Sequence, residues 1–138
     1  MLLAFGAISG LLARWLSVEN DERDADLALI EAEAHGEEAR LLDRLHGCRA
    51  QPGCVATVRA NIANPRLRRP GAVKILQLES HTAYSLTGDT GNTRLAWTVI
   101  GKLPVVQCVR VRRSGNFVTG MSVTVLSLSA PIPNENGC

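Results

Sequence analysis

The sequence predicts an α+β fold in which a long N-terminal helix packs on an antiparallel sheet of about four strands. An uncharged, mostly apolar run at residues 2–13 leads into a helical pattern at 19–45. Beyond residue 73, short segments alternate apolar and polar side chains and are separated by turn signals. The 138 residues suit one domain. We expect three parts: an apolar segment at 1–18, an acidic amphipathic helix at 19–47 and a β-sheet body at 48–138.

The charges of the chain are divided between its two ends. Residues 1–45 carry four basic and ten acidic side chains, a net charge of −6, whereas residues 46–138 carry eleven basic and three acidic ones, a net charge of +8. Such a division is typical of two parts that meet different neighbours. A partner of a single charge sign, such as bulk nucleic acid, would explain only the second half, so we do not expect nucleic acid to be the partner.

The run at 2–13 has three interpretations: a membrane anchor, a secretory signal or a buried helix. A signal peptide would carry basic residues ahead of the run and a small-x-small cleavage site, and a buried soluble helix would have a polar face. We favour an anchor that contacts the bilayer through residues 2–16, with Arg14 snorkelling and Trp15 at the membrane interface. Gly6 and Gly10 form a Gly-x-x-x-Gly pattern, which predicts a face for close helix packing.

The segment 19–45 reads as an amphipathic helix. Its apolar residues recur at threes and fours, at Leu27, Ile30, Ala34, Leu41 and Leu45. Asn20 or Asp21 is expected to cap its start, Gly36 to bend it and Gly47 to stop it. We interpret its acidic side chains as a solvated face, the alternative being a contact with other subunits.

Four cysteines, at positions 48, 54, 108 and 138, allow three pairings. Cys48 and Cys54 enclose a Pro-Gly turn, and a bridge from Cys108 to Cys138 would tie the C-terminal tail to the body. The spacings do not resemble paired zinc ligands, so we expect disulfides in preference to free thiols and expect no metal. Disulfides would place the body outside the cytoplasm.

The body begins with a short helix at 55–63 that Asn64-Pro65 ends. One or two strands are expected at 73–86, and alternation is clear at 94–99, 109–112 and 121–125, with turns at 88–92, 101–104 and 113–116. Leu95, Trp97 and Val99 share one face, which the amphipathic helix is expected to cover. We expect a basic surface from Arg66, Arg68, Arg69, Arg110 and Arg112, and because no aromatic residues lie between the first three, a solvated loop is the simpler interpretation there.

The sequence gives no sign of catalysis. None of the three histidines, His35, His46 and His81, has a metal-site partner three or four residues on, and no nucleotide-binding, Gly-x-Ser-x-Gly or His-Glu-x-x-His motif occurs. His46 lies near Cys48, which a disulfide explains more simply than a reactive thiol. We therefore predict a protein that is not an enzyme and needs no cofactor.

The order of these parts resembles the type IV pilins and the related pseudopilins of secretion systems. The resemblance lies in an apolar N-terminal segment that continues into an amphipathic helix, then a loop, an antiparallel sheet and a C-terminal cysteine pair, here Cys108 and Cys138. It implies a structural subunit whose apolar helix is anchored in a bacterial inner membrane and then packs in a filament core, with the body periplasmic or extracellular. No acidic residue precedes Glu19, where the family usually carries one near its mature N terminus, so a minor subunit or a trimmed sequence fits better.

Two other functions remain open. One is a single-pass accessory or assembly subunit of another membrane complex, and the other is a secreted binding module whose run at 2–13 is a signal. In every case we expect the partners to be proteins, either other copies or a larger complex. The opposite charges of the two halves suggest that the acidic helix of one copy lies against the basic body of a neighbour.

Overall fold

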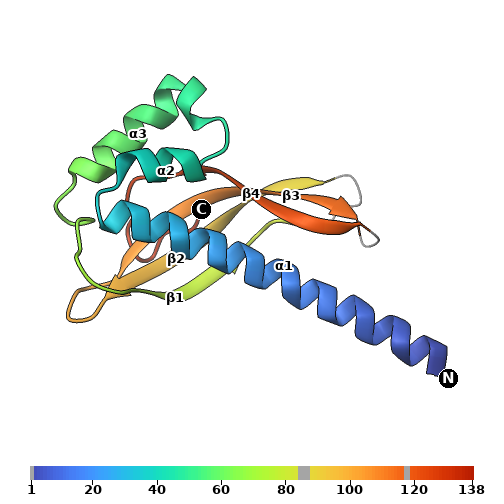
Figure 1. Ribbon diagram of the computed structural model, residues 1–138. Coiled ribbons are helices and arrows are strands. Elements are labelled where there is room, and N and C mark those ends of the chain that lie inside the picture. The colour runs from blue at the N-terminus through green and yellow to red at the C-terminus, as the bar shows by residue number, and fades with distance from the viewer. Residues whose placement is uncertain (1, 84–87, 117–118) are drawn as a thin grey trace.

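The computed structural model describes residues 2–83, 88–116 and 119–138, and these have the predicted α+β architecture. The long helix α1 (Leu2–Ala34) lies across one face of a four-stranded antiparallel sheet and projects beyond it (Figure 1). The strands follow one another as a meander, β1 (Val73–Ser80), β2 (Asp89–Val99), β3 (Val105–Asn116) and β4 (Gly120–Leu128). At one end stand α2 (Glu38–Arg44), the 3-10 turn η1 (Cys48–Ala50) and α3 (Pro52–Ala63).

Helix α1 passes without a break from the apolar segment into the acidic one. Its 33 residues span about 50 Å, and because the backbone is already helical before residue 20, the expected cap at Asn20 or Asp21 is wrong. The expected bend is confirmed: α1 ends at Ala34, Gly36 has a φ of +72°, and α2 begins at Glu38. Gly47, also at φ +72°, confirms the expected stop before η1.

The core lies between α1 and the inner face of the sheet. Leu95, Trp97 and Val99 of β2 are buried together, which confirms the face that the alternation predicted. The predicted apolar positions of the helical region are buried as well, except Leu27, which is half-buried. The amphipathic part of α1 therefore covers the sheet as expected.

Several boundaries differ from the sequence prediction. The first strand, β1, ends at Ser80, and residues 84–87 of the region where a second strand was considered lie outside the described residues. The expected turns at 88–92 and 113–116 mostly continue strands, because β2 begins at Asp89 and β3 runs to Asn116. Helix α3 begins three residues before the predicted 55, since Pro52 at its first turn needs no hydrogen-bond acceptor for a backbone N–H.

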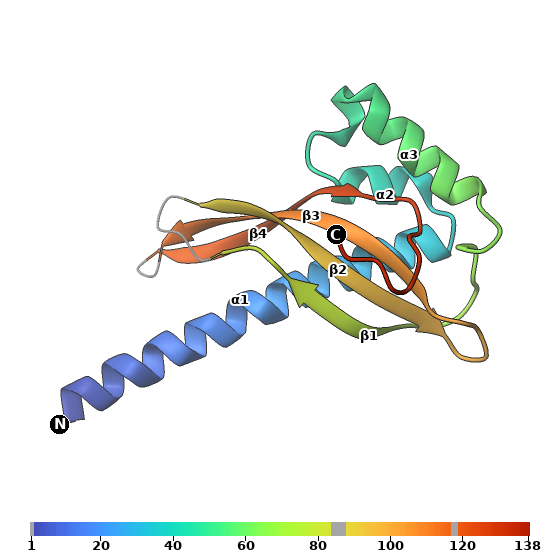
Figure 2. The ribbon, with the colours of Figure 1, turned by 180° about the vertical axis from the view of Figure 1, so that it is seen from behind.

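Two disulfides join Cys48 to Cys54 and Cys108 to Cys138, so the expectation of paired cysteines is confirmed. The second fastens the C-terminal segment to β3. That segment lies against the outer face of the sheet, the face away from α1, where Arg94 donates to the carbonyl oxygens of Asn134 and Asn136 (Figure 2). Apart from this segment, the view of Figure 2 shows no helix across the outer face.

Candidate functional site

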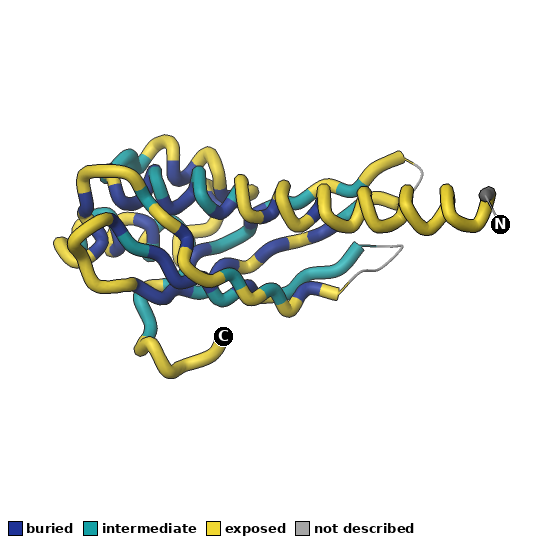
Figure 3. Tube along the Cα trace, turned by 90° about the horizontal axis from the view of Figure 1, so that it is seen from below, coloured by how far each residue is buried: buried dark blue, intermediate teal, exposed yellow. Residues whose placement is uncertain are grey.

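The first half of α1 stands clear of the body. Residues 3–17, which we call the projecting segment, are all exposed, whereas α1 becomes buried where it runs along the sheet (Figure 3). Leu3 is 91% exposed and Phe5 74%. Other large apolar side chains of the segment are also exposed, namely Ile8, Leu11, Leu12, Trp15 and Leu16. An apolar surface of this size is typical of a site that binds protein or lipid.

The projecting segment has two different sides. At 100° per residue, most of its bulky side chains fall on one side of the helix, including Phe5, Ile8, Leu12 and Trp15. The opposite side carries small residues at spacings of four, three and four, at Gly6, Gly10, Ala13 and Ser17. A Cβ atom added at Gly6 or Gly10 would meet nothing within 4 Å, so this side is open to a close neighbour.

No helix formed by residues 2–83, 88–116 or 119–138 has an apolar stretch long enough to cross a membrane. The predicted anchor at residues 2–16 and the interface roles of Arg14 and Trp15 stay predictions.

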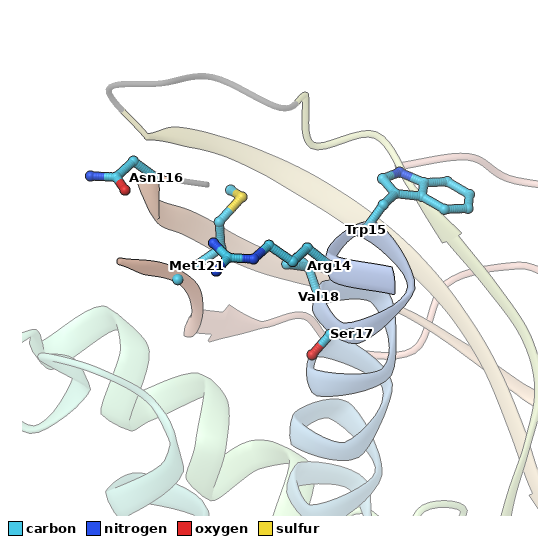
Figure 4. Close-up of a pocket in the computed structure, with 7 residues that line it drawn as sticks. Arg14, Trp15, Ser17, Val18, Asn116 and Met121 are labelled. Carbon is cyan, nitrogen blue, oxygen red and sulfur yellow. The ribbon is translucent and has the colours of Figure 1, made fainter. Parts of the chain in front are cut away.

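A small cavity lies where the projecting segment meets the body. Its volume is about 130 Å³, and it lies between α1 and the ends of β3 and β4. Figure 4 shows the Arg14 side chain extending toward Met121 of β4, while Trp15 points away on the other side of the helix. The lining is Arg14, Trp15, Ser17, Val18, Asn116, Gly120 and Met121.

Further along, α1 places three carboxyl groups inside the helix–sheet interface. Glu22 is fully buried and forms an ion pair with Arg113 of β3, with 2.9 Å from Nε and 2.5 Å from Nη2 to Oε2. Its other oxygen accepts from the Thr93 hydroxyl of β2 at 2.5 Å. A buried pair of this kind costs desolvation and depends on both partners, so it fixes how α1 sits on the sheet.

Asp26 lies one turn beyond Glu22 and is also fully buried. Neither of its carboxylate oxygens has a hydrogen-bond partner among the described residues. Burial, with a smaller contribution from the charge of Glu22, raises the pKa of Asp26 from 3.8 to about 8. Asp26 is therefore protonated in the folded protein at neutral pH.

Glu33 is the third buried carboxyl group of α1, and unlike Asp26 it has hydrogen-bond partners. Its Oε1 accepts from the amide of Asn61 at 2.7 Å and from that of Gln107 at 3.0 Å, and Gln107 in turn accepts from the Trp97 indole at 2.7 Å. Burial raises the pKa of Glu33 to about 7, against the smaller lowering effect of the two amide hydrogen bonds. This network joins α1, α3 and two strands.

The structure does not bring the five predicted basic residues together. Arg69 is a correction, because it is only 8% exposed: its guanidinium lies over the Trp97 ring and donates to the Leu103 carbonyl oxygen at 2.6 Å. Burial, and then the charge of Arg66, lowers the pKa of Arg69. Arg66 and Arg68 are exposed beside it. Arg110 and Arg112 lie away from these three, together on the outer face of the sheet.

Sequence reasoning also missed the buried carboxyl groups, because it treated the acidic residues as a solvated face. The signal was their spacing: Glu22, Asp26, Leu29 and Glu33 follow at four, three and four residues, the pattern of one helix face. Among the described residues, three further ion pairs are exposed. Two of these join the acidic half to the basic half within one molecule, Glu38 to Arg59 and Asp43 to Arg49.

No group of three or more histidine, cysteine or acidic side chains among the described residues is arranged to hold a metal ion. Neither a protein-family model, nor a curated protein, nor a solved structure matches this chain. The candidate site is thus defined by geometry alone: an exposed apolar helix joined to a disulfide-linked α+β body.

Proposed function

We propose that this chain is a non-enzymatic, membrane-anchored extracytoplasmic structural subunit, pilin-like or minor-pilin-like, that assembles with other protein subunits through its N-terminal helix. The observation that carries the proposal is the exposure of the projecting segment, whose large apolar side chains are between 42% and 91% exposed. Burying them against lipid or protein would be favourable by about 25 cal/mol for each Å² removed from water.

Two further features support this function. The disulfides suit an oxidising compartment beyond the bilayer. The small side chains around Gly6 and Gly10 would let a second helix approach closely, which is how helices associate in lipid. The proposed location is the bacterial inner membrane, with the body in the periplasm or in a cell-surface filament.

The test compares the full chain with two variants in detergent, followed by detergent removal and electron microscopy. G6L/G10L fills the small-residue side, while the matched control A4L/S9L adds the same number of leucines elsewhere on the projecting segment. We expect the wild type and the control to form ordered assemblies and G6L/G10L to lose them. A wild type that stays monomeric and binds no vesicles would refute the proposal.

The mature N terminus separates the proposal from the alternatives. In the natural host, mass spectrometry of a filament subunit should show a processed N terminus. An intact Met1 in a discrete complex with another protein would identify an accessory subunit, and release into the medium without residues 1–13 would identify a secreted module.

A further inference from the structure

The outer face of the sheet carries a small cationic surface. Arg110 and Arg112 of β3 point to the opposite side from the buried Val109 and Val111, and both are exposed. Neither has an ion pair or a hydrogen bond to its side chain among the described residues. Their cross-strand neighbours on β2 and β4 are hydroxyl and amide residues, namely Thr90, Asn92, Thr124 and Ser127. We call Arg110 and Arg112 the cationic face.

The opposite side of the molecule carries negative charge. On α1, Asp21, Asp24 and Glu31 fall on the side of the helix away from the sheet, because Glu22 and Asp26 occupy the side toward it. Asp21 and Asp24 are exposed and Glu31 is half-buried, and none of the three has a side-chain partner among the described residues. We call these three residues the acidic stripe.

The two surfaces match in spacing as well as in sign. Side chains three residues apart on a helix lie about 5–6 Å apart, as Asp21 and Asp24 do. Side chains two residues apart on a strand are separated by about 6.8 Å, as Arg110 and Arg112 are. Two carboxylates can therefore face two guanidiniums, the pairing that arginine makes best.

We propose that the acidic stripe of one copy docks on the cationic face of the next, an inference that rests on the proposed function. The surfaces lie on opposite sides of one helix–sheet layer, so they cannot meet within a molecule (Figures 1 and 2). A contact between two different surfaces of identical copies is heterologous and continues without closing unless its rotation forms a ring. Exposed charges mainly set the register and rate of such docking, and the apolar helix supplies the affinity.

A groove beside the cationic face gives this contact room. It has a volume of about 520 Å³, lies between the first half of α3, the first half of β3 and the C-terminal end of β4, and has Arg110, Asn92 and Ser127 in its lining. A carboxylate that enters it meets a guanidinium together with amide and hydroxyl donors. The second copy is the occupant that the molecule itself supplies, since its acidic stripe has the complementary charge and spacing.

The test is a charge exchange between two full-length variants that are purified in detergent and then sedimented at low salt after the detergent has been removed. In R110E/R112E alone, the acidic stripe of one copy would face glutamates on the next copy, and in D21R/D24R alone, two arginines would face the cationic face of the next copy. Because like charges repel, each variant should associate at least tenfold more weakly than the wild type. An equal mixture restores both kinds of contact and should recover the wild-type assembly. R66E/K102E, the matched control with the same change of net charge as R110E/R112E, should associate like the wild type and should not rescue D21R/D24R.

Cross-linking identifies the contact directly. R110K/R112K keeps the charge and provides amines that a carbodiimide joins to carboxylates. In a mixture of ¹⁴N- and ¹⁵N-labelled chains, the expected product links an amine of this variant to Asp21 or Asp24 of the other isotope. If R110E/R112E assembles as the wild type does, this contact is overturned but the proposed function stays intact. A wild type that stays monomeric and binds no vesicles overturns both. Loss of binding to anionic vesicles in R110E/R112E, with no cross-link between copies, would assign the cationic face to lipid and also overturn the contact.

Discussion

Replacing Asp26 with Asn is expected to remove a large part of the pH dependence of stability. The unfolded chain releases the Asp26 proton near pH 3.8 and the folded protein near pH 8, because burial disfavours the charged carboxylate. Between these values the folded state holds a proton that the unfolded state has lost, so the free energy of unfolding falls as pH rises. Each pH unit is worth about 1.4 kcal/mol, which gives about 4 kcal/mol between pH 5 and pH 8.

Urea unfolding of the oxidised full chain in mild detergent, followed by circular dichroism, measures this effect. The amide of D26N matches the shape of the protonated carboxyl, so the two proteins should differ little near pH 4. The advantage of D26N should then grow by about 4 kcal/mol from pH 5 to pH 8. Glu33 contributes a pH dependence of the same sign to both proteins, so it cancels in the comparison.

The matched control is D24N, which changes an exposed aspartate on the same helix and should alter stability by less than about 0.5 kcal/mol at every pH. If the difference between D26N and the wild type were the same at pH 5 and pH 8, Asp26 would be ionised in the folded protein, and the assignment of a buried, neutral carboxyl would be wrong.

Three other substitutions test the packing, each by urea unfolding. R113M leaves the Glu22 carboxylate buried without its ion-pair partner and should cost about 3–5 kcal/mol, part of which the double variant E22Q/R113M should recover. C108S opens a disulfide that spans 30 residues and should cost about 3–4 kcal/mol, an effect that must vanish when both proteins are reduced. G91A places a Cβ 2.7 Å from the Cα of Thr82 and should cost about 1–3 kcal/mol, whereas G6A, with nothing within 4 Å, should be neutral or slightly stabilising.

Most of the fold could be predicted from the alternation of apolar and polar side chains along the strands. Leu95, Trp97 and Val99 repeat with period two, so their common face could be read directly, and it is the face that α1 covers. The bend at Gly36 could be predicted for a similar reason, since the left-handed backbone that it adopts favours glycine. The strand ends could not be placed, because Gly91 and Gly115 resemble turn residues but lie within β2 and β3.

The partners of the charged interface residues could not be predicted from local pattern. A carboxylate on a helix is usually solvated, and only the partner shows otherwise: Glu22 and Arg113 are 91 residues apart in the chain. The sequence likewise groups Arg69 with its neighbours Arg66 and Arg68, although its guanidinium is buried over the Trp97 ring. The spacing of Glu22, Asp26 and Glu33 places them on one helix face, but the long-range partner of a charged side chain leaves no signal near it in the sequence.

The geometry of α1 explains why its apolar side chains become exposed where they do. The side that carries Phe5, Ile8 and Trp15 is the side that, further along, faces the sheet with Asp26 and Leu29. The helix keeps one face throughout. What changes is the cover, because the sheet reaches only as far as the end of β3 and the start of β4, where the cavity beside Arg14 and Met121 lies. A partner that buries the bulky side of the projecting segment must therefore cover the same helix face as the sheet, beyond the point where the sheet ends. A lipid surface would do this, and so would the body of a second copy aligned along the helix.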